Sequence, residues 1–304
     1  MDRRTFLKQV MLWSAGACFM PVFRITPDLL ANEKVPARVV VANGTDYPSI
    51  LKKAIESEGG MASIVKNGSK VVIKPNIGWD RNVEQGANTH PLIVKTLAEM
   101  ALLAGAAQVM VFDRTCNEER RCYANSGIKD ELETIRDKRI KCVHIDDRKF
   151  VPVQIEKGKS LDEWSFYRDA LEADCYINVP VAKHHALAGL TIGLKNIMGV
   201  IGGHRGRIHW DMAQNLADLN TVIKPTLNVV DATRILTRNG PQGGNVKDVK
   251  KMDTIIVSKD IVAADAYATT LFGKKPEDID AIRKAWESGL GEMDLFKMNI
   301  VKLS

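Results

Sequence analysis

The sequence predicts an α/β protein with a doubly wound, largely parallel sheet and helices on both of its faces. Two observations carry this prediction. Short apolar, β-branched runs alternate along the chain with segments whose apolar residues have helical spacing, and this alternation is typical of a parallel sheet covered by helices. In addition, several of the strand-like runs end at a polar or charged residue, as strands do where open α/β sheets bind ligands.

The first half of the chain alternates regularly. The pattern predicts strands at residues 35–42, 70–74, 108–112 and 140–145, and helices at residues 47–58, 91–103 and 129–136. Thr89 is the expected N-cap of the helix at 91–103, and Gly105 is the expected stop. Residues 151–155 are expected to form an antiparallel edge strand.

The second half begins with an apolar run at residues 176–179 that stops at Pro180. A strand is expected at 226–230, ending at Asp231, and the polar stretch 238–251 is expected to be a long loop over a site. The remaining predicted elements are helices at 212–222, 261–271 and 277–286 and strands at 254–257 and 298–303.

Composition excludes several classes of protein. The apolar fraction of 45% and the charged fraction of 26% are those of an ordinary globular domain. A formal charge of +6 suits a basic pocket for an anion, but no block of lysines and arginines indicates nucleic-acid binding. No run approaches the ~20 apolar residues of a membrane span.

The N-terminus resembles a bacterial twin-arginine export signal. Paired arginines, Arg3 and Arg4, precede Phe6-Leu7-Lys8 and a short apolar run at residues 10–23. The sequence therefore predicts a signal peptide at 1–31, a single α/β domain at 32–304, the export machinery as a partner and a periplasmic location. A lipid anchor at Cys18 is a weaker alternative, because the residues before it lack the usual leucine.

Four cysteines lie in the expected domain. Cys142 and Cys175 fall in predicted strands and are expected to be buried thiols, whereas Cys116 and Cys122 fall in a polar loop and are the candidates for a disulfide. No Cys-x-x-Cys motif occurs, so an iron–sulfur cluster built from this chain alone is not expected.

A polar crevice is expected around the glycine-rich stretch 178–209, which contains four of the six histidines. The strand ends share one edge of a parallel sheet, so their polar residues are expected to converge there; these are Lys74, Asn76, Asp113, Asp146, Asn178 and Asp231.

Two chemistries fit such a crevice. In the first, cationic side chains bind a small anionic ligand that glycine amides approach closely, with Lys74, Lys183, Lys195, Arg205, Arg207, Gly199, Gly202 and Gly203 as candidates. In the second, imidazole and carboxylate groups bind a divalent metal, with His185, His204, His209, Asp113 and Asp231 as candidates. Glycine-rich nucleotide motifs and the Gly-x-Ser-x-Gly motif of serine hydrolases are absent from the sequence.

An ordered series of short motifs runs through residues 38–273. The series consists of Lys74-Pro75-Asn76, Thr89-x-Pro91, Asn178-Val179-Pro180, Lys183, His185, Leu190-Thr191, Leu194-Lys195-Asn196, Gly199, His209, Leu216-Ala217-Asp218, Val230-Asp231-Ala232, Gly240-Pro241, Gly243, Ser258-x-Asp260, Ala263 and Asp265-Ala266. Over this range the chain resembles the domain-of-unknown-function 362 family. Some members of the family that this series resembles are exported, and some carry cysteine-rich ferredoxin segments. The cysteines of such a segment are absent from this sequence. The matching residues with side-chain chemistry are Lys74, Asn76, Lys183, His185, Lys195, Asn196, His209, Asp231 and Asp265.

The leading hypothesis is an exported enzyme, or redox-linked accessory protein, that acts on a small anionic ligand. We expect Lys183, His185, Lys195 and His209 to be catalytic, and Lys74, Asn76, Asn196, Gly199 and Arg205 to bind the ligand or a cofactor. If a metal is bound, its expected ligands are His185, His209 and Asp231. The alternatives are a non-catalytic protein that holds a cofactor or metal for maturation, and an iron–sulfur-associated accessory that passes electrons to a redox partner.

Overall fold

The computed structural model describes residues 35–304, and Pro36–Ser304 form one compact unit. The predicted signal peptide, with its paired arginines and Cys18, lies outside the described residues. Among the described helices, none combines the length and the apolar character that crossing a membrane requires.

A large, mostly parallel sheet forms the centre of the fold. Every strand in its main order runs in one direction except β11, which is antiparallel to both of its neighbours. The order is β12 (Asn299–Leu303), β1 (Arg38–Asn43), β11 (Val249–Ser258), β10 (Leu227–Leu236), β7 (Cys175–Val179), β2 (Lys70–Pro75), β3 (Gln108–Val111) and β4 (Ile140–Cys142). The predicted largely parallel sheet is confirmed.

Two further strands extend the sheet beside β10. The chain leaves β7 at Pro180, which cannot donate a ladder hydrogen bond, and β8 (Val181–His185) then pairs in parallel with the second half of β10. β9 (Gly189–Thr191) returns antiparallel to β8. The glycine-rich stretch is therefore partly regular structure rather than one long loop.

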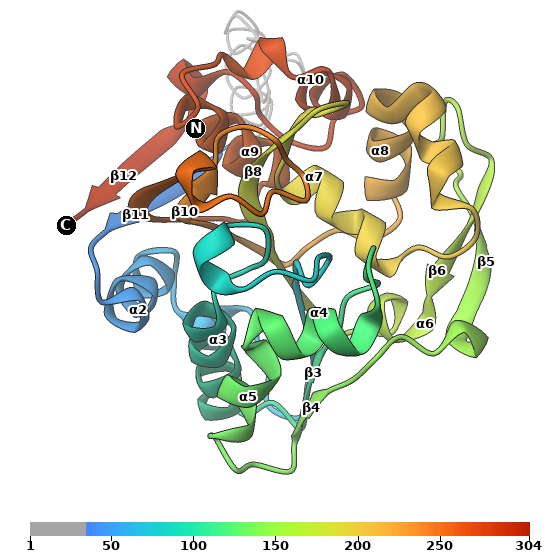
Figure 1. Cartoon of the computed structure of the whole chain (residues 1–304). Helices are drawn as coiled ribbons and strands as arrows, with labels where there is room; N and C mark the ends of the chain where they lie inside the picture. Colours follow the sequence, from blue (N-terminus) through green and yellow to red (C-terminus); the bar gives the residue numbers. More distant parts are fainter. Residues whose placement is uncertain (1–34) are drawn as a thin grey trace, which may run out of the picture. The chain divides into compact units, whose positions relative to one another are not determined.

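Helices cover both faces of the sheet, as predicted (Figure 1). Alternate residues of one strand enter opposite cores, because successive side chains of a strand point to opposite faces: Val40 belongs to one core, and Val39 and Val41 to the other. The first core lies under α2 (Tyr47–Ser57), α3 (Pro91–Leu103), α4 (Glu119–Ser126) and α5 (Ile128–Glu133). The opposite face packs against α6 (Arg168–Leu171), α7 (Gly193–Asn196), α8 (Met212–Asn220), α9 (Ile261–Thr270) and α10 (Asp280–Glu287).

The predicted edge strand at 151–155 is antiparallel but does not join the main sheet. It is β5 (Phe150–Gln154), which pairs only with β6 (Glu163–Tyr167) in a separate hairpin. Phe150 and Tyr167 face each other in this pair, with ring centroids 5.3 Å apart. The hairpin packs its apolar side chains into the core beside α8.

Two local predictions are wrong for reasons that involve distant residues. The N-cap of α3 is His90, whose Nδ1 accepts the amide of Leu92 at 3.2 Å. Thr89 is instead a cross-link, since its hydroxyl donates to the carbonyl of Val179 at 2.7 Å. Asp231 does not end a strand, because β10 continues to Leu236.

Tyr123 connects the ends of β3 and β4 through its buried hydroxyl, and its removal is expected to destabilise the fold. The hydroxyl accepts the amide of Asp113 at 2.9 Å and donates to the carbonyl of Val143 at 2.9 Å. Tyr123→Phe leaves both groups unsatisfied, so urea unfolding should show a loss of about 1–3 kcal/mol. Tyr176→Phe is the matched control: its hydroxyl is buried with no hydrogen-bond partner among residues 35–304, so its removal should cost nothing. Equal losses in both variants would contradict this account.

Candidate functional site

The site begins with a buried ion pair at the carboxyl ends of β2 and β3. The Nζ of Lys74 lies 2.7 Å from Oδ1 of Asp113, and it also donates to Oδ1 of Asn196 at 2.7 Å. The second oxygen of Asp113 accepts the amide of Ile77 at 2.6 Å. Burial lowers the pKa of Lys74, and the carboxylate of Asp113 opposes this shift.

Backbone packs directly against this ion pair. Gly199 has room for no side chain, because a Cβ there would overlap Oδ1 of Asp113 and the end of Lys74. The sequence placed Gly199 near a ligand; the structure places it against protein side chains. Its role is to let the chain after α7 close over the pair.

Asn196 joins α7 to the sheet. Its Nδ2 donates to Oδ1 of Asn178 at 2.8 Å and to the carbonyl of Lys74 at 3.0 Å. Asn178 is aligned with Lys74 across β7 and β2, and its own Nδ2 donates to Oδ1 of Asn228 on β10 at 3.1 Å. A row of buried amides therefore crosses three strands and fixes the position of α7.

Asp265 on α9 holds the other end of α7. Its two carboxyl oxygens accept the amides of Gly193 and Leu194 at 2.8 and 2.9 Å, so that it caps the helix from outside. Burial raises the pKa of Asp265 to about 7, and the two amide donors oppose that shift. Asp265 is thus a positioning residue for Lys195, which α7 carries.

Lys183 enters the site from β8. Its Nζ donates to Oδ1 of Asn76 at 2.9 Å and to the carbonyl of Ala87. Only 1% of the residue is exposed, and burial lowers its pKa to about 7. Lys183 therefore has two neutral oxygens as acceptors and no carboxylate partner among the described ion pairs.

The buried amine of Lys195 has a weaker hydrogen-bond partner than the amine of Lys183. Its only hydrogen-bond acceptor among residues 35–304 is Sδ of Met212, at 3.1 Å, and a thioether is a weak acceptor. The residue is 9% exposed, and burial lowers its pKa to about 8. At neutral pH most Lys195 side chains carry a charge that no carboxylate balances.

His185 and His209 stack against each other in the site, with ring centroids 6.3 Å apart. Nδ1 of His185 accepts the amides of Leu187 and Ala188, both at 3.1 Å, so its proton resides on Nε2. Burial and then the charge of Lys195 lower the pKa of His185 to about 3 and keep this ring neutral. Burial likewise lowers the pKa of His209.

Arg205 and Arg207 differ in what their guanidinium groups contact. Arg205 donates from Nη1 to the carbonyls of Arg114 and Met198 at 2.9 and 3.1 Å and from Nη2 to Thr115 at 2.7 Å. Three of its five N–H groups are thereby engaged and two are left over. Arg207 lies outside the site, with its guanidinium over the rings of Trp164 and Trp210.

These groups surround a cavity of about 450 Å³, which is hereafter the central cavity. Its cationic and imidazole groups converge from β8, α7 and the segment after it, and no aspartate or glutamate is among its lining residues. The lining consists of Asn76, Trp79, Cys116, Lys183, His185, Ala186, Leu187, Thr191, Lys195, Met198, Arg205, Gly206, His209 and Pro241.

Comparison with protein families settles the affiliation of the chain. Residues 71–270 match the family described as a domain of unknown function, DUF362, which is more than half of the chain. The chain belongs to the DUF362 family. The predicted family resemblance is confirmed over this range, which contains the ion pair and every residue that lines the central cavity.

One curated relative is the thylakoid-associated protein sll1697 of Synechocystis. It is 25% identical over 249 residues, which cover 79% of this chain and 74% of the relative. Among solved structures, a Thermotoga maritima protein has a TM-score of 0.45 and the apoprotein of lactate racemase from Thermoanaerobacterium thermosaccharolyticum one of 0.46, each at 12% identity. The DUF362 chain aligns with 59% and 56% of those two chains through 74% and 76% of its own length.

Of the three expected metal ligands of this DUF362 chain, His185 and His209 lie together in the central cavity, but Asp231 does not join them. Oδ2 of Asp231 accepts the amide of His90 at 2.7 Å, and Oδ1 accepts the amide and hydroxyl of Thr233 at 2.9 and 2.7 Å, so the carboxylate is fully engaged outside the central cavity. In the part of the chain from residue 35 onward, no group of three histidine, cysteine, aspartate or glutamate side chains is arranged to hold a metal ion. Asp146 is also elsewhere, paired with Arg148 at 2.8 Å.

Several lining residues of the DUF362 cavity were not predicted. Cys116 was considered only as a candidate disulfide partner of Cys122; all four cysteines of residues 35–304 are free, and Cys122 is buried in α4. Cys116 follows β3 by five residues, so the strand-end argument would have placed it correctly. Pro241 comes from the loop between β10 and β11, which was expected to lie over a site.

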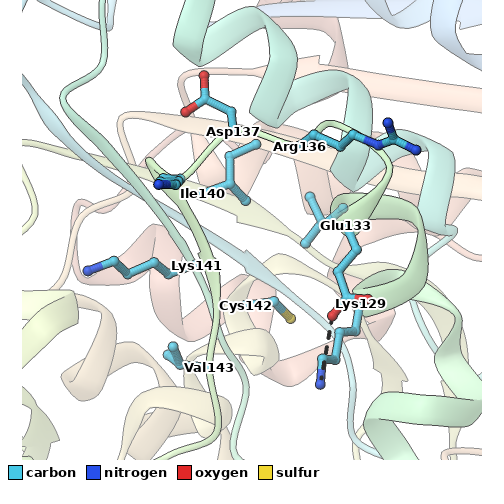
Figure 2. Close-up of a pocket in the computed structure, with 10 residues that line it drawn as sticks. Lys129, Glu133, Arg136, Asp137, Ile140, Lys141, Cys142 and Val143 are labelled. Carbon is cyan, nitrogen blue, oxygen red and sulfur yellow. Dashed lines mark ion pairs between the residues drawn. The ribbon is translucent and has the colours of Figure 1, made fainter.

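A second pocket lies between α5 and the edge strand β4, with Cys142 turned toward Lys129 and Glu133 (Figure 2). It differs from the central cavity in its charge, since Glu133 and Asp137 accompany its lysines and arginine. Lys129 and Glu133 pair with each other at 3.9 Å. Its two carboxylates partly offset the four cationic side chains of its lining, whereas no carboxylate lines the central cavity.

Replacement of Gly199 by alanine is expected to disrupt the buried ion pair of the site. The added methyl group would overlap the Lys74–Asp113 pair, and separating a buried pair costs about 3–5 kcal/mol. Thermal and urea unfolding of Gly199→Ala should show a loss of this size. Gly206→Ala is the control in the same segment, because its Cβ would meet no atom within 4 Å and should leave stability unchanged. A stable Gly199→Ala protein would show that the pair is not packed in this way.

Proposed function

We propose that the protein binds a small anionic ligand in the central cavity and acts on it by proton transfer. The supporting observation is the charge of that cavity: Lys183, Lys195 and Arg205 line it and no carboxylate does. Cations withdrawn from water without a carboxylate partner are costly, and a ligand that supplies the missing negative charge accounts for their retention. The apolar walls strengthen such an attraction by excluding water.

The proposed roles follow from the partners of each group. Lys183, held by Asn76, and Arg205, held by backbone carbonyls, are suited to fix the anion because their positions are set before it arrives. Lys195 and His209 are suited to exchange protons, since burial lowers the pKa of Lys195 to about 8 and also lowers that of His209. His185 stays neutral and offers its Nε2 proton as a hydrogen bond.

Anion binding is expected to weaken as the pH rises from 6 to 9. Lys183 and Lys195 lose their charge as the pH passes about 7 and about 8, so the cavity is fully cationic only below that range. A charge-assisted hydrogen bond contributes about 1.5–3 kcal/mol, which corresponds to a fall in affinity of about tenfold or more. Titration calorimetry with oxalate, phosphate and pyruvate in buffers of different ionisation enthalpy would measure both the affinity and the proton uptake.

Lys195→Met should remove much of this pH dependence and weaken binding at pH 6.5 by about tenfold. Lys247→Met is the control, because Lys247 is exposed and does not line the central cavity. Binding of the anions with turnover would support an enzyme, and binding without turnover would support the alternative of a carrier or maturation protein. Affinities that do not change with pH or with Lys195 would overturn the proposal.

We also infer that the chain is exported by the twin-arginine route. The inference depends on Arg3 and Arg4 before Phe6-Leu7-Lys8 and the short apolar run that follows. The double variant Arg3→Lys, Arg4→Lys should retain the protein in the cytoplasm, while Arg24→Lys, outside the motif, should not. Cell fractionation with an antibody to the mature domain would distinguish them, and export of the double variant would contradict the inference.

A further inference from the structure

We propose that Lys195 is an imine-forming amine: the anion taken by the central cavity is a 2-oxo acid, and Lys195 condenses with its keto carbon. This inference rests on the proposed function, which it deepens by naming the class of ligand and a covalent step. It depends on three features of the site, namely the bonding of its three lysines, the position of the anion-holding groups, and the apolar walls.

The three buried lysines differ in what occupies their amines. Lys74 is bonded to a carboxylate and an amide oxygen, and Lys183 to an amide and a carbonyl oxygen. Lys195 alone has a thioether as its partner among the described residues, and it lines the central cavity. A nucleophilic amine needs a lone pair that is unprotonated and accessible, and Lys195 is the lysine least committed to oxygen acceptors.

The surroundings of Lys195 favour its neutral form. Desolvation in an apolar pocket and neighbouring cations are the two usual ways of activating a lysine, and both act here. Burial has the largest effect on the amine and the charge of Arg205 acts in the same direction, giving a pKa of about 8. A substantial minority of the amine is then unprotonated at pH 7.5, compared with almost none for an ordinary lysine.

The other groups of the cavity match the remaining parts of a 2-oxo acid. The carboxylate is adjacent to the keto carbon, so a carboxylate held by Lys183 and the free N–H groups of Arg205 would bring that carbon to the neighbouring amine. Trp79, Leu187 and Met198 supply apolar wall for the hydrocarbon side chain. An inorganic anion such as phosphate would leave this apolar wall unused.

The condensation balances without any further reactant. The lone pair of Lys195 Nζ forms the C–N bond, and the electrons of the carbonyl π bond move to oxygen. The two amine hydrogens are transferred to this oxygen, which leaves as water as the C=N bond forms. Nε2 of His209 is suited to relay these protons, because its Nδ1 lies 3.3 Å from the carbonyl of Gly206 and serves as the donor.

Reductive trapping tests the imine. The purified protein would be incubated with pyruvate or phenylpyruvate and sodium cyanoborohydride at pH 7.5, followed by intact-mass measurement and peptide mapping. We expect about one equivalent of reduced adduct on the peptide that contains Lys195, with lactate giving none. Lys195→Arg should give no adduct, and calorimetry with oxalate, which cannot form an imine, would show whether the variant still takes an anion.

The outcomes separate this inference from the proposed function. An adduct on Lys183, or adducts spread over surface lysines equally in the unaltered protein and in Lys195→Arg, would overturn the assignment to Lys195. Binding of pyruvate in calorimetry with no adduct would overturn imine formation and leave anion binding intact. Failure of pyruvate, phosphate and oxalate alike to bind would overturn both. Circular dichroism of Lys195→Arg would confirm that the variant is folded before either comparison is made.

Discussion

The buried contact between Lys74, Asp113 and Asn196 is the constraint on which the site depends. A lysine inside a protein is costly unless charge and hydrogen bonds compensate for the lost water. Here the carboxylate supplies the charge, the amide of Asn196 supplies the second acceptor, and Gly199 lets the backbone close over both. Because Asn196 belongs to α7, satisfying Lys74 fixes α7 against the sheet. The same interaction that stabilises the carboxyl ends of β2 and β3 therefore sets the position of the neighbouring residue, Lys195.

The partners that stabilise each buried lysine become weaker from the Lys74–Asp113 contact toward the central cavity. Lys74 has a carboxylate, Lys183 has neutral oxygens, and Lys195 has a sulfur. The pKa values of Lys183 and Lys195, about 7 and about 8, do not follow this order, because Lys183 is the more deeply buried and desolvation dominates both shifts. The protonation state of each amine and its accessibility from the central cavity are thus separate properties. Lys183 is enclosed and oriented by its acceptors, whereas Lys195 faces the cavity with only a weak acceptor for its proton.

The sequence was sufficient for the strands in the main order of the sheet and for the helices on its faces, because these depend on short-range patterns. Alternation of strand and helix predicts the layers, and strand ends predict where Lys74 and Asn178 lie.

The predictions that failed concern residues whose hydrogen-bond partners are distant in sequence. Asp231 looked like a strand end, but its oxygens are satisfied by His90 and Thr233, so β10 passes through it without a free carboxylate. His90 replaces Thr89 as a cap because the hydroxyl of Thr89 reaches Val179. The short β9 and α7 were hidden in a glycine-rich segment whose structure comes from tertiary contacts, chiefly Asp265.

The uncompensated charges also connect ligand binding to stability. A lysine whose pKa is lower in the folded state than in the unfolded chain destabilises the fold while it is protonated, and the loss is relieved as the pH rises from the folded pKa toward the unfolded one. For Lys195 this window runs from about 8 to the ordinary lysine value, so at neutral pH the full cost is present. A bound anion would remove that cost by pairing with the charge, so that part of its electrostatic binding energy would come from relieving a cost already present in the fold. A cavity of this kind favours an anion over a neutral analogue of the same shape, because only the anion relieves the repulsion among Lys183, Lys195 and Arg205.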